Sequence, residues 1–418
     1  MMKSGTFTTS ALLTAVCLLT PLAHAAADMA VKTAAENAQT EFIENLRQMV
    51  LIESGSADLK GLAQMATLVE SRLKALGFAT ERHKTTTGAG ADIVVGTLKG
   101  TGQKKFMLQA HMDTVYQPGI LNTQGYKVDG NRIYGPGIAD DKGGIAVILH
   151  SLAILKDRGW KDFAQITVMF NPDEEVGSIG SGELISQLAD QHDVVLSCEP
   201  TAAKSVAKNE AVLLGASGAT RMDMHVTGKA SHAGAAPDLG RNALVELSHQ
   251  IVQTRDVYKS IPGVQLNWTV SQAGTVRNQI PDKAQASADV RTTLPGSAEK
   301  LQTTLQNMVN TQKLIPETDT RVTLIGGRPP YQGGAKAKAL AEKAQAIYQE
   351  LDRQLDIVPM TGGATDAAFA ARSDKAAVIE SFGLAGWGYH AKDEYIEVDS
   401  IVPRLYLMTR MLMELGKN

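Results

Sequence analysis

The order of predicted strands and helices changes once along this chain and later returns. Up to residue 215, helices alternate with short apolar strands, which predicts an α/β fold with a mostly parallel central sheet. Residues 216–325 instead follow the order β-α-β-β-α-β, typical of a small two-layer, ferredoxin-like α+β sandwich. Beyond residue 326 the helix and strand alternation resumes. We therefore expect one larger domain, residues 26–215 and 326–418, with residues 216–325 inserted into it.

Apolar spacing and turn residues place the individual elements. In the larger domain we expect helices at 36–50, 59–76, 144–158 and 182–188, and strands at 91–98, 105–109, 165–170 and 193–197. In the inserted domain we expect strands at 221–227, 266–273, 284–291 and 321–325, and helices at 242–255 and 298–311. Glycine pairs such as Gly326-Gly327 indicate turns or close approaches of the backbone.

The first 25 residues have the features of an export signal. An apolar run at 11–22 follows Lys3 and precedes the small-x-small sequence Ala23-His24-Ala25. A membrane anchor is the alternative, but about 20 apolar residues are needed to span a bilayer. Lipidation at Cys17 is a second alternative, and Val16 suits such a site poorly. We expect a periplasmic or secreted protein without a stable membrane anchor.

The charge balance indicates the class of partner, and the cysteine content decides whether a disulfide bond can form. With 41 basic and 44 acidic residues and no dense basic run, the chain has no field suited to nucleic acid, so a small-molecule partner is expected. After removal of the signal, Cys198 is the one remaining cysteine, which excludes an intramolecular disulfide.

Five side chains that can bind metal each end or follow a strand-like run. In α/β sheets, sites form where strands end, so we expect these residues to converge. Two imidazoles and three carboxylates suit a pair of zinc ions that share one bridging carboxylate. The five residues are His111, Asp140, Glu175, Glu199 and His390.

Two neighbours of these residues have suitable positions for catalysis. Asp113 lies two residues beyond His111, on the same face of a strand, where its carboxylate can orient the imidazole. Glu174 and Glu175 are consecutive and point in different directions, so one can bind metal while the other stays free to move a proton. Taken singly, each motif has a plain structural alternative: a turn or cap, a solvated acidic loop, a salt bridge or a loop histidine. The joint pattern favours the metal centre.

Several longer motifs resemble one family along nearly the whole mature chain. They are His-Met-Asp-Thr-Val-Tyr at 111–116, Tyr-Gly-Pro-Gly-Ile-Ala-Asp-Asp-Lys-Gly-Gly at 134–144, Gly-Lys-Ala-Ser-His-Ala-Gly-Ala-Ala-Pro at 228–237 and Thr-Asp-Ala-Ala at 365–368. In this order they resemble the co-catalytic di-zinc exopeptidases, which include aminoacylases, desuccinylases and glutamate carboxypeptidases.

The resemblance implies a role for each metal-site residue. His111 and Glu199 would bind one zinc ion, Glu175 and His390 the other, and Asp140 would bridge the two. Glu174 would be the general base and Asp113 the orienting carboxylate. It also implies a cis peptide between Asp140 and Asp141.

The resemblance further implies a homodimer formed through the inserted domain. His232 would reach into the partner's active site and stabilise the oxyanion, with a turn histidine as the alternative. Asn278 and Arg291 would hold the free carboxylate of the substrate, because an arginine fork matches a carboxylate. Arg328 is a second candidate for that carboxylate, equally compatible with an ordinary salt bridge. The backbone around Gly362 would line the same pocket.

The expected activity is hydrolysis of the amide bond to a C-terminal glutamate, with folate and its analogues as possible substrates. An aminoacylase or dipeptidase of the same family is the alternative. A non-catalytic protein that binds small acids is a minor alternative. Such a protein would lack a metal ligand or the general base, and this sequence retains all of them. A structural zinc module would normally need a cysteine-rich site, which a chain with the single mature cysteine Cys198 cannot form.

Three departures from the glutamate carboxypeptidases affect the region that reads the acyl group. Ala364 stands where those enzymes have a glycine, Cys198 stands where they have a phenylalanine, and residues 202–214 match poorly. None of these changes removes a metal ligand.

Overall fold

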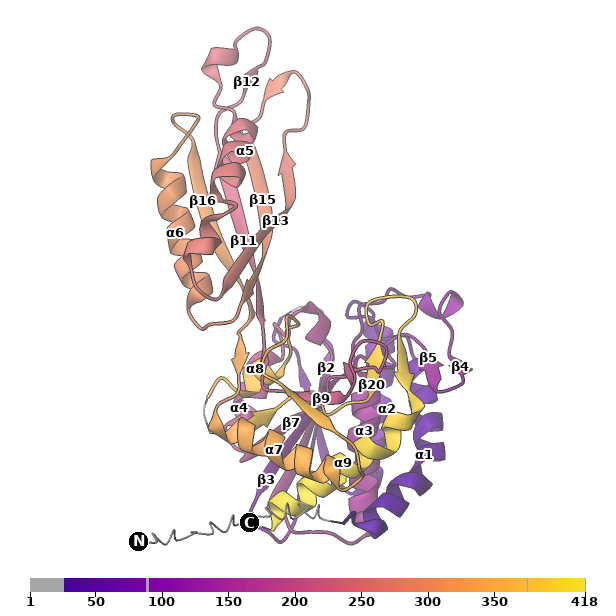
Figure 1. Ribbon diagram of the computed structural model, residues 1–418. Coiled ribbons are helices and arrows are strands. Elements are labelled where there is room, and N and C mark those ends of the chain that lie inside the picture. The colour runs from indigo at the N-terminus through magenta and orange to yellow at the C-terminus, as the bar shows by residue number, and fades with distance from the viewer. Residues whose placement is uncertain (1–25, 88–89, 374, 418) are drawn as a thin grey trace, which may run out of the picture.

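Figure 1 shows the computed structural model, which describes residues 26–87, 90–373 and 375–417. The proposed export signal lies outside these residues. The chain forms a larger body, built from its first and last parts, and a smaller elongated body that stands on it. None of the helices in the described ranges has the length and apolarity to cross a membrane.

A six-stranded sheet forms the centre of the larger body. Its three pairings β6–β3, β3–β7 and β7–β19 are parallel, whereas β1–β2 and β2–β6 are antiparallel. The expectation of a mostly parallel sheet is therefore confirmed, with an antiparallel edge that the sequence did not indicate. In sheet order the strands are β1 (Ala79–Lys84), β2 (Asp92–Lys99), β6 (Gln165–Asn171), β3 (Lys105–His111), β7 (Val194–Ser197) and β19 (Ala377–Ile379).

Both faces of this sheet are buried, which explains the continuous apolar runs in its strands. Phe106 and Leu108 of β3 face one core, whereas Met107 faces the other. The larger core is covered by α1 (Met29–Val50), α2 (Leu59–Leu76), α3 (Lys142–Asp157), α7 (Ala335–Gln349) and α9 (Ile401–Gly416). The smaller core is covered by α4 (Gly182–Ala189) and α8 (Ala367–Ala370).

The first two helices have the local signals that fix their ends. Asp58 caps α2 by accepting a hydrogen bond from the backbone N–H of Gly61, and Gly77 ends the helix at φ 96°, a conformation that favours glycine. α2 occupies the expected residues 59–76. α1 begins at Met29, seven residues earlier than expected, because Asp28 caps it.

Short strands link distant parts of the larger body and were not predicted. A five-stranded sheet contains β4 (Lys127–Asp129), β5 (Arg132–Tyr134), β21 (Tyr395–Glu397), β20 (Ala385–Trp387) and β8 (Thr201–Ala202), in that order. Two-stranded ribbons are formed by β9 (Glu210–Leu213) with β18 (Leu355–Val358), and by β10 (Gly215–Ala216) with β17 (Tyr331–Gln332). The 3₁₀ turns are η1 (Ile120–Asn122), η2 (Glu174–Val176), η3 (Pro237–Leu239), η4 (Val257–Ser260) and η5 (Val398–Ser400).

The smaller body is a four-stranded antiparallel sheet with two helices on one face. Its strands, in sheet order, are β13 (Val264–Ala273), β15 (Lys283–Thr292), β11 (Gly218–Thr227) and β16 (Asp319–Arg328). The helices are α5 (Ala243–Thr254) and α6 (Ser297–Thr311), and they share a separate apolar core with the sheet. β12 (Ser231–His232) and β14 (Gln279–Ile280) pair at the far end of this body (Figure 1). The expected α+β order is confirmed.

One strand end differs from the expectation. β16 continues through Gly326-Gly327 to Arg328, three residues beyond the expected end, so this glycine pair is not a turn. Arg328 pairs with Ala219 across a bulge, and a Cβ at Gly327 would lie 2.2 Å from the carbonyl oxygen of Ala219. The glycine therefore permits a close approach of two strands. As a result, Arg328 lies at the junction of the two bodies.

Candidate active site

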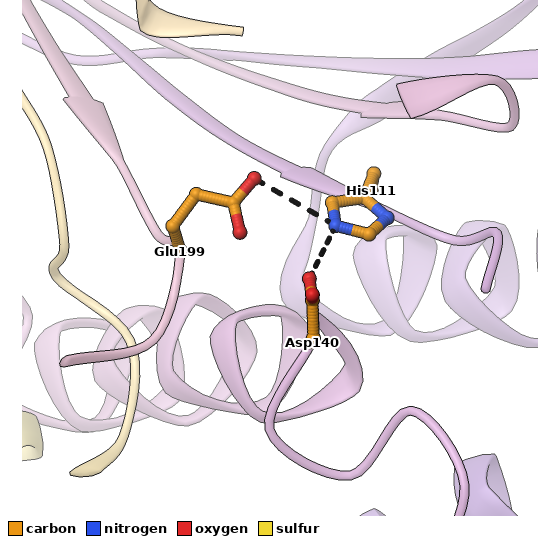
Figure 2. A group of neighbouring side chains, drawn as sticks. All are labelled: His111, Asp140 and Glu199. Carbon is orange, nitrogen blue, oxygen red and sulfur yellow. Dashed lines mark hydrogen bonds and ion pairs between the residues drawn. The ribbon is translucent and has the colours of Figure 1, made fainter. Parts of the chain in front are cut away.

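His111, Asp140 and Glu199 form the first of two groups of side chains that could hold a metal ion (Figure 2). His111 ends β3, Glu199 follows β7, and Asp140 lies in the loop before α3. Nε2 of His111 lies 3.0 Å from Oδ1 of Asp140 and 3.7 Å from Oε1 of Glu199. Figure 2 shows both carboxylates pointing to the same ring nitrogen, so a cation held by one of them would be within reach of the other two side chains.

Asp140, Glu175 and His390 form the second group. Nε2 of His390 lies 3.4 Å from Oδ2 of Asp140 and 3.2 Å from Oε2 of Glu175. The two oxygens of Asp140 therefore face different histidines, Oδ1 toward His111 and Oδ2 toward His390. This is the arrangement that a carboxylate needs to bridge two cations.

Asp113 connects the histidine with the loop that carries Glu174 and Glu175. Its Oδ1 lies 3.3 Å from Nδ1 of His111 and accepts a hydrogen bond from the backbone N–H of Glu174. Its Oδ2 accepts from the N–H of Glu175 and from the hydroxyl of Ser56 at 2.7 Å. Asp113 is fully buried, so it fixes the position of His111 relative to both glutamates.

The electrostatics of the two groups fit a cation. Burial lowers the pKa of His111, but the carboxylates of Glu199, Asp113 and Asp140 outweigh burial and raise it well above its usual range. Hydrogen bonds that its ring donates to the carboxylates of Asp140 and Glu175 raise the pKa of His390 to about 10. Burial raises the pKa of Glu199 well above normal. Several buried carboxylates thus favour protonated, positively charged imidazoles. A pair of divalent metal ions would supply this positive charge in place of the protons.

Glu174 is buried and pairs with Arg328. Nη1 of Arg328 lies 2.7 Å from Oε1 of Glu174, and Nη2 donates to the backbone carbonyl of the same residue at 2.6 Å. Nε of Arg328 lies 3.6 Å from Oδ1 of Asp366. Burial raises the pKa of Glu174 well above normal, and Arg328 opposes that shift. Of the two interpretations of Arg328 that the sequence left open, the structure has the salt bridge.

Two buried carboxylates that the sequence analysis missed support the metal-binding residues. Glu394 accepts from the N–H groups of Ala139 at 2.9 Å and of Asp140 at 3.1 Å. Glu380 accepts from the N–H of Glu199 at 3.2 Å and from the hydroxyl of Thr365. Glu380 follows the apolar strand β19, the same signal that pointed to Glu199, so it could have been found. Glu394 lies among charged residues and gave no such signal.

The peptide bond between Asp140 and Asp141 is cis, as the family resemblance implied. Asp141 caps α3 by accepting from the N–H of Gly144, and its other oxygen accepts from the N–H of His111 at 3.3 Å. Asp141 therefore holds the loop and β3 together, while Asp140 faces the histidines.

A cavity of about 580 Å³ opens beside these groups. Its metal-side wall contains Asp140, Glu174, Glu175, Glu199 and His390. Arg291 and Arg328 line the cavity near the junction of the two bodies, and Trp387 and Tyr389 contribute aromatic rings. The space can hold a substrate of moderate size directly against the candidate metal centre.

The structure places the other expected substrate residues in two locations. Arg291 lines the cavity, with its guanidinium paired to Asp289 at 2.9 and 3.1 Å. Gly362 lines an adjacent pocket that also includes Arg291. His232 and Asn278 are exposed at the far end of the smaller body, where the N–H of Ala233 donates to the carbonyl oxygen of Asn278. This chain does not bring His232 or Asn278 to its own metal-binding residues.

Comparison with solved structures supports the fold. A tripeptidase from Staphylococcus aureus matches 91% of this chain and 99% of its own, with a TM-score of 0.73 and 20% identity. An M20 family metallo-carboxypeptidase from Sulfolobus solfataricus matches 90% of this chain and 100% of its own, also with a TM-score of 0.73, at 16% identity.

Comparison of sequences gives the family. Carboxypeptidase G2 from Pseudomonas sp. (strain RS-16) is 45% identical over 384 residues, which cover 92% of this chain and 91% of the relative. A succinyl-diaminopimelate desuccinylase from Gluconobacter oxydans is 24% identical over 293 residues, 67% of this chain and 73% of the relative. The model of "Peptidase family M20/M25/M40" matches residues 107–414, which include all five expected metal ligands. The resemblance seen in the motifs is thereby confirmed: the chain belongs to peptidase family M20/M25/M40.

Proposed function

We propose that this protein is a zinc-dependent glutamate carboxypeptidase that hydrolyses the amide bond between an acyl group and a C-terminal glutamate, folates and their analogues included. One observation carries the proposal. The two oxygens of Asp140 face His111 and His390 within a chain that is 45% identical to Carboxypeptidase G2.

The donor set supports two zinc ions. His111 and Glu199 would bind one ion, Glu175 and His390 the other, and Asp140 would bridge them. Imidazole and carboxylate are ligands that zinc accepts. When bound, the metal ions polarise the scissile carbonyl and lower the pKa of a water molecule to roughly 7.

Glu174 is the general base in this proposal. Its carboxylate takes a proton from the attacking water and then donates it to the leaving amine. The pKa of Glu174 is raised by burial, which favours a carboxyl that can hold this proton between the two steps. Asp113 keeps Glu174 in place through its backbone N–H and orients His111 at the same time.

Arg291 is the group proposed to bind the substrate's free carboxylate. It lines the cavity and presents a planar fork of N–H donors that suits a carboxylate in two-point fashion. Asp289 holds the guanidinium at present, so it also fixes the orientation of the fork. Both arginines are paired with a carboxylate, but the side chain of Arg328 is buried against Glu174 whereas that of Arg291 is 39% exposed, so Arg291 is the stronger candidate of the two.

A homodimer would bring the remaining residues to the site. β13 is an edge strand of the small sheet, and several apolar side chains on β13, α5 and the nearby loops are exposed. Such a surface favours association with a second copy. His232 and Asn278 would then act in the partner's cavity, His232 on the oxyanion and Asn278 on the substrate. The exposed residues are Leu239, Leu244, Val245, Val252, Val270 and Val276.

Mixing two inactive variants tests the shared site. His232→Ala lacks the group that it lends, and Glu174→Ala lacks its own base. After subunit exchange, a mixed dimer contains one complete site, so activity should return to about a quarter of wild type for a statistical mixture. A mixture that stays inactive, although light scattering shows mixed dimers, would contradict the shared site.

A substrate panel with identified products tests the activity itself. The zinc-loaded protein is given folic acid, methotrexate, N-acetyl amino acids and simple dipeptides. Release of glutamate from the first two supports the proposal. Preference for N-acetyl amino acids or dipeptides would instead favour an aminoacylase or dipeptidase, an alternative kept open by the desuccinylase relative. Glu174→Ala should retain two metals and lose turnover; if it hydrolyses at the wild-type rate, Glu174 is not the base.

We also propose that the protein is exported and that residues 1–25 are removed. The support is the apolar segment with its small-x-small end. Sequencing the N-terminus of protein from a periplasmic fraction tests this, with Ala26 as the expected first residue.

A further inference from the structure

The ribbon of β9 and β18 has two faces with different surroundings. Its strands run parallel, with Leu355 opposite Glu210 and Val358 opposite Leu213. One face points into the protein, where Glu210 accepts hydrogen bonds from the hydroxyl of Tyr348 at 2.6 Å and from Nε of Arg404 at 2.7 Å. The residues that line the cavity alternate with Glu210: Asn209, just before β9, with Ala211 and Leu213 of β9, and Asp356 and Val358 of β18. The outer face of the ribbon is thus a wall of the active-site cavity.

One end of the ribbon lies next to the two arginines of the cavity, and its other end lies farther from them. Beyond Leu213 the chain enters β10 and then β11, where Ala219 pairs with both Arg291 and Arg328. The end of the ribbon at Leu213 and Val358 is therefore the one next to the arginines. At about 3.3 Å per residue, Asp356 lies roughly 7 Å farther along its strand than Val358. The cavity thus has its two arginines at one end and the carboxylate of Asp356 toward the other.

Asp356 has amide partners and no cationic one. Its oxygens accept from Nδ2 of Asn209 at 3.3 and 3.2 Å, and Oδ1 also accepts from Nε2 of Gln354 at 3.1 Å. Within the described ranges, no lysine or arginine lies within ion-pair distance of this carboxylate. A carboxylate can accept about four hydrogen bonds, so Asp356 retains acceptor capacity toward the cavity.

The walls between the two ends are apolar and aromatic. Leu213 and Val358 contribute aliphatic side chains, and Trp387 and Tyr389 contribute rings whose centroids lie 5.3 Å apart. Trp387 is partly exposed, so its ring is accessible to a ligand in the cavity. Flat aromatic groups pack well against such walls.

We propose that the β9–β18 side of the cavity is an acyl subsite for long, flat aromatic acyl groups that end in N–H donors, and that Asp356 is its specificity-determining residue. The proposal rests on the proposed function, because the orientation follows from a substrate carboxylate held near Arg291. The amide bond then lies at the metal centre, and the acyl group extends along the ribbon. An amino-substituted heterocycle at its end can donate a charge-assisted hydrogen bond to the acceptor site that Asp356 retains. The subsite includes residues 209–213, in the segment that departs from the glutamate carboxypeptidases.

Two substrates with the same leaving group test the subsite. Folic acid has an acyl group that ends in an amino-substituted pteridine, whereas the acyl group of N-benzoyl-L-glutamate is a single ring without distant donors. We expect Asp356→Asn to lower the ratio of kcat/KM for folic acid to that for N-benzoyl-L-glutamate by roughly tenfold or more. The matched control is Asp352→Asn, which removes the same charge from an exposed turn on the same segment, where φ of 55° suits asparagine. That control should leave the ratio unchanged.

The outcomes separate this inference from the proposed function. If wild type cleaves both substrates and Asp356→Asn leaves the ratio within twofold of wild type, the subsite is wrong while the carboxypeptidase stands. An equal loss on both substrates gives Asp356 a structural role and also overturns the subsite. If metal-loaded wild type releases glutamate from neither substrate, the proposed function itself fails. Thermal melting of both variants confirms that they are folded.

Discussion

Nη1 of Arg328 lies 2.7 Å from Oε1 of Glu174, and both side chains are buried where the two bodies of the molecule meet. Arg328 ends β16 of the small sheet, whereas Glu174 lies in η2 of the larger body. The proposed general base is therefore paired with a residue that the inserted segment delivers. Removing one partner would leave the other charge buried without compensation.

This pair gives a stability prediction. We expect Arg328→Met to lower the free energy of unfolding of the metal-free protein by about 3 kcal/mol, since breaking a buried ion pair typically costs about 3–5 kcal/mol. The double variant Glu174→Gln with Arg328→Met removes both charges, so it should be more stable than Arg328→Met alone. Urea unfolding of wild type, Glu174→Gln, Arg328→Met and the double variant gives the coupling free energy between the two side chains. Simple additivity of the two single changes would show that the pair contributes nothing as a pair.

Asp140 gives a prediction about metal content. Because each of its oxygens faces a different histidine, Asp140→Asn removes a ligand from both groups at once. We expect the bound zinc to fall from two ions per chain to one or none, with loss of hydrolysis. Elemental analysis after dialysis measures the stoichiometry. Asp129→Asn, which changes an exposed carboxylate on β4, is the control and should keep two ions. Two tightly held ions in Asp140→Asn would exclude a bridging role.

The helices and longer strands could be predicted from the sequence because their apolar residues repeat with a clear period. α2 and β13 are examples, correct to within two residues. Strands of two or three residues, such as β8 and β20, are too short to show a period. β1 contains only exposed and half-buried positions and has no apolar face, so it gave no signal either. These short elements nevertheless hold the loops around the site.

The convergence of the candidate metal ligands could be predicted for a different reason. His111 ends one buried strand and Glu199 follows another, and strand ends converge at one edge of a parallel sheet. The pairing of Arg328 with Glu174 depends instead on how the small sheet sits on the larger body, which no local pattern encodes. The support of the Asp140 loop by Glu394 is equally non-local, since 254 residues separate the two.

Glu394 is expected to position Asp140. Besides the N–H groups of Ala139 and Asp140, it accepts from the N–H of Gly137 and the hydroxyl of Tyr116, both at 2.8 Å. In Glu394→Gln an NH₂ group would face at least one of these donors. We predict a loss of about 1–3 kcal/mol in the free energy of unfolding and a roughly 10- to 100-fold weaker zinc affinity.

The neighbouring Asp393→Asn is the control for Glu394→Gln, because Asp393 is exposed and the change in charge is the same. Competition with a chelator measures the zinc affinity, and urea unfolding measures the stability. Wild-type zinc affinity in Glu394→Gln would mean that the loop holds Asp140 without this carboxylate.

His150 gives a prediction for pH. It is buried in α3, packs against the ring of Phe42 at 5.1 Å and accepts a hydrogen bond at Nε2 from Nδ2 of Asn45 at 3.0 Å. Burial, with Arg72 nearby, lowers the pKa of His150 to about 4. In the unfolded chain the imidazole takes up a proton near pH 6.5, whereas in the folded chain it stays neutral until pH 4, so the unfolded state binds more protons between these values. The free energy of unfolding should therefore decrease as pH falls below 6.5, with about 2 kcal/mol lost through this group between pH 7.5 and 5.

Urea unfolding at several pH values tests the role of His150. The decrease should be shallower for His150→Gln than for wild type, because the variant has no group to protonate at this position. His225→Gln, on an exposed position of β11, should follow wild type. Equal slopes for wild type and His150→Gln would show that His150 is already able to bind a proton in the folded protein.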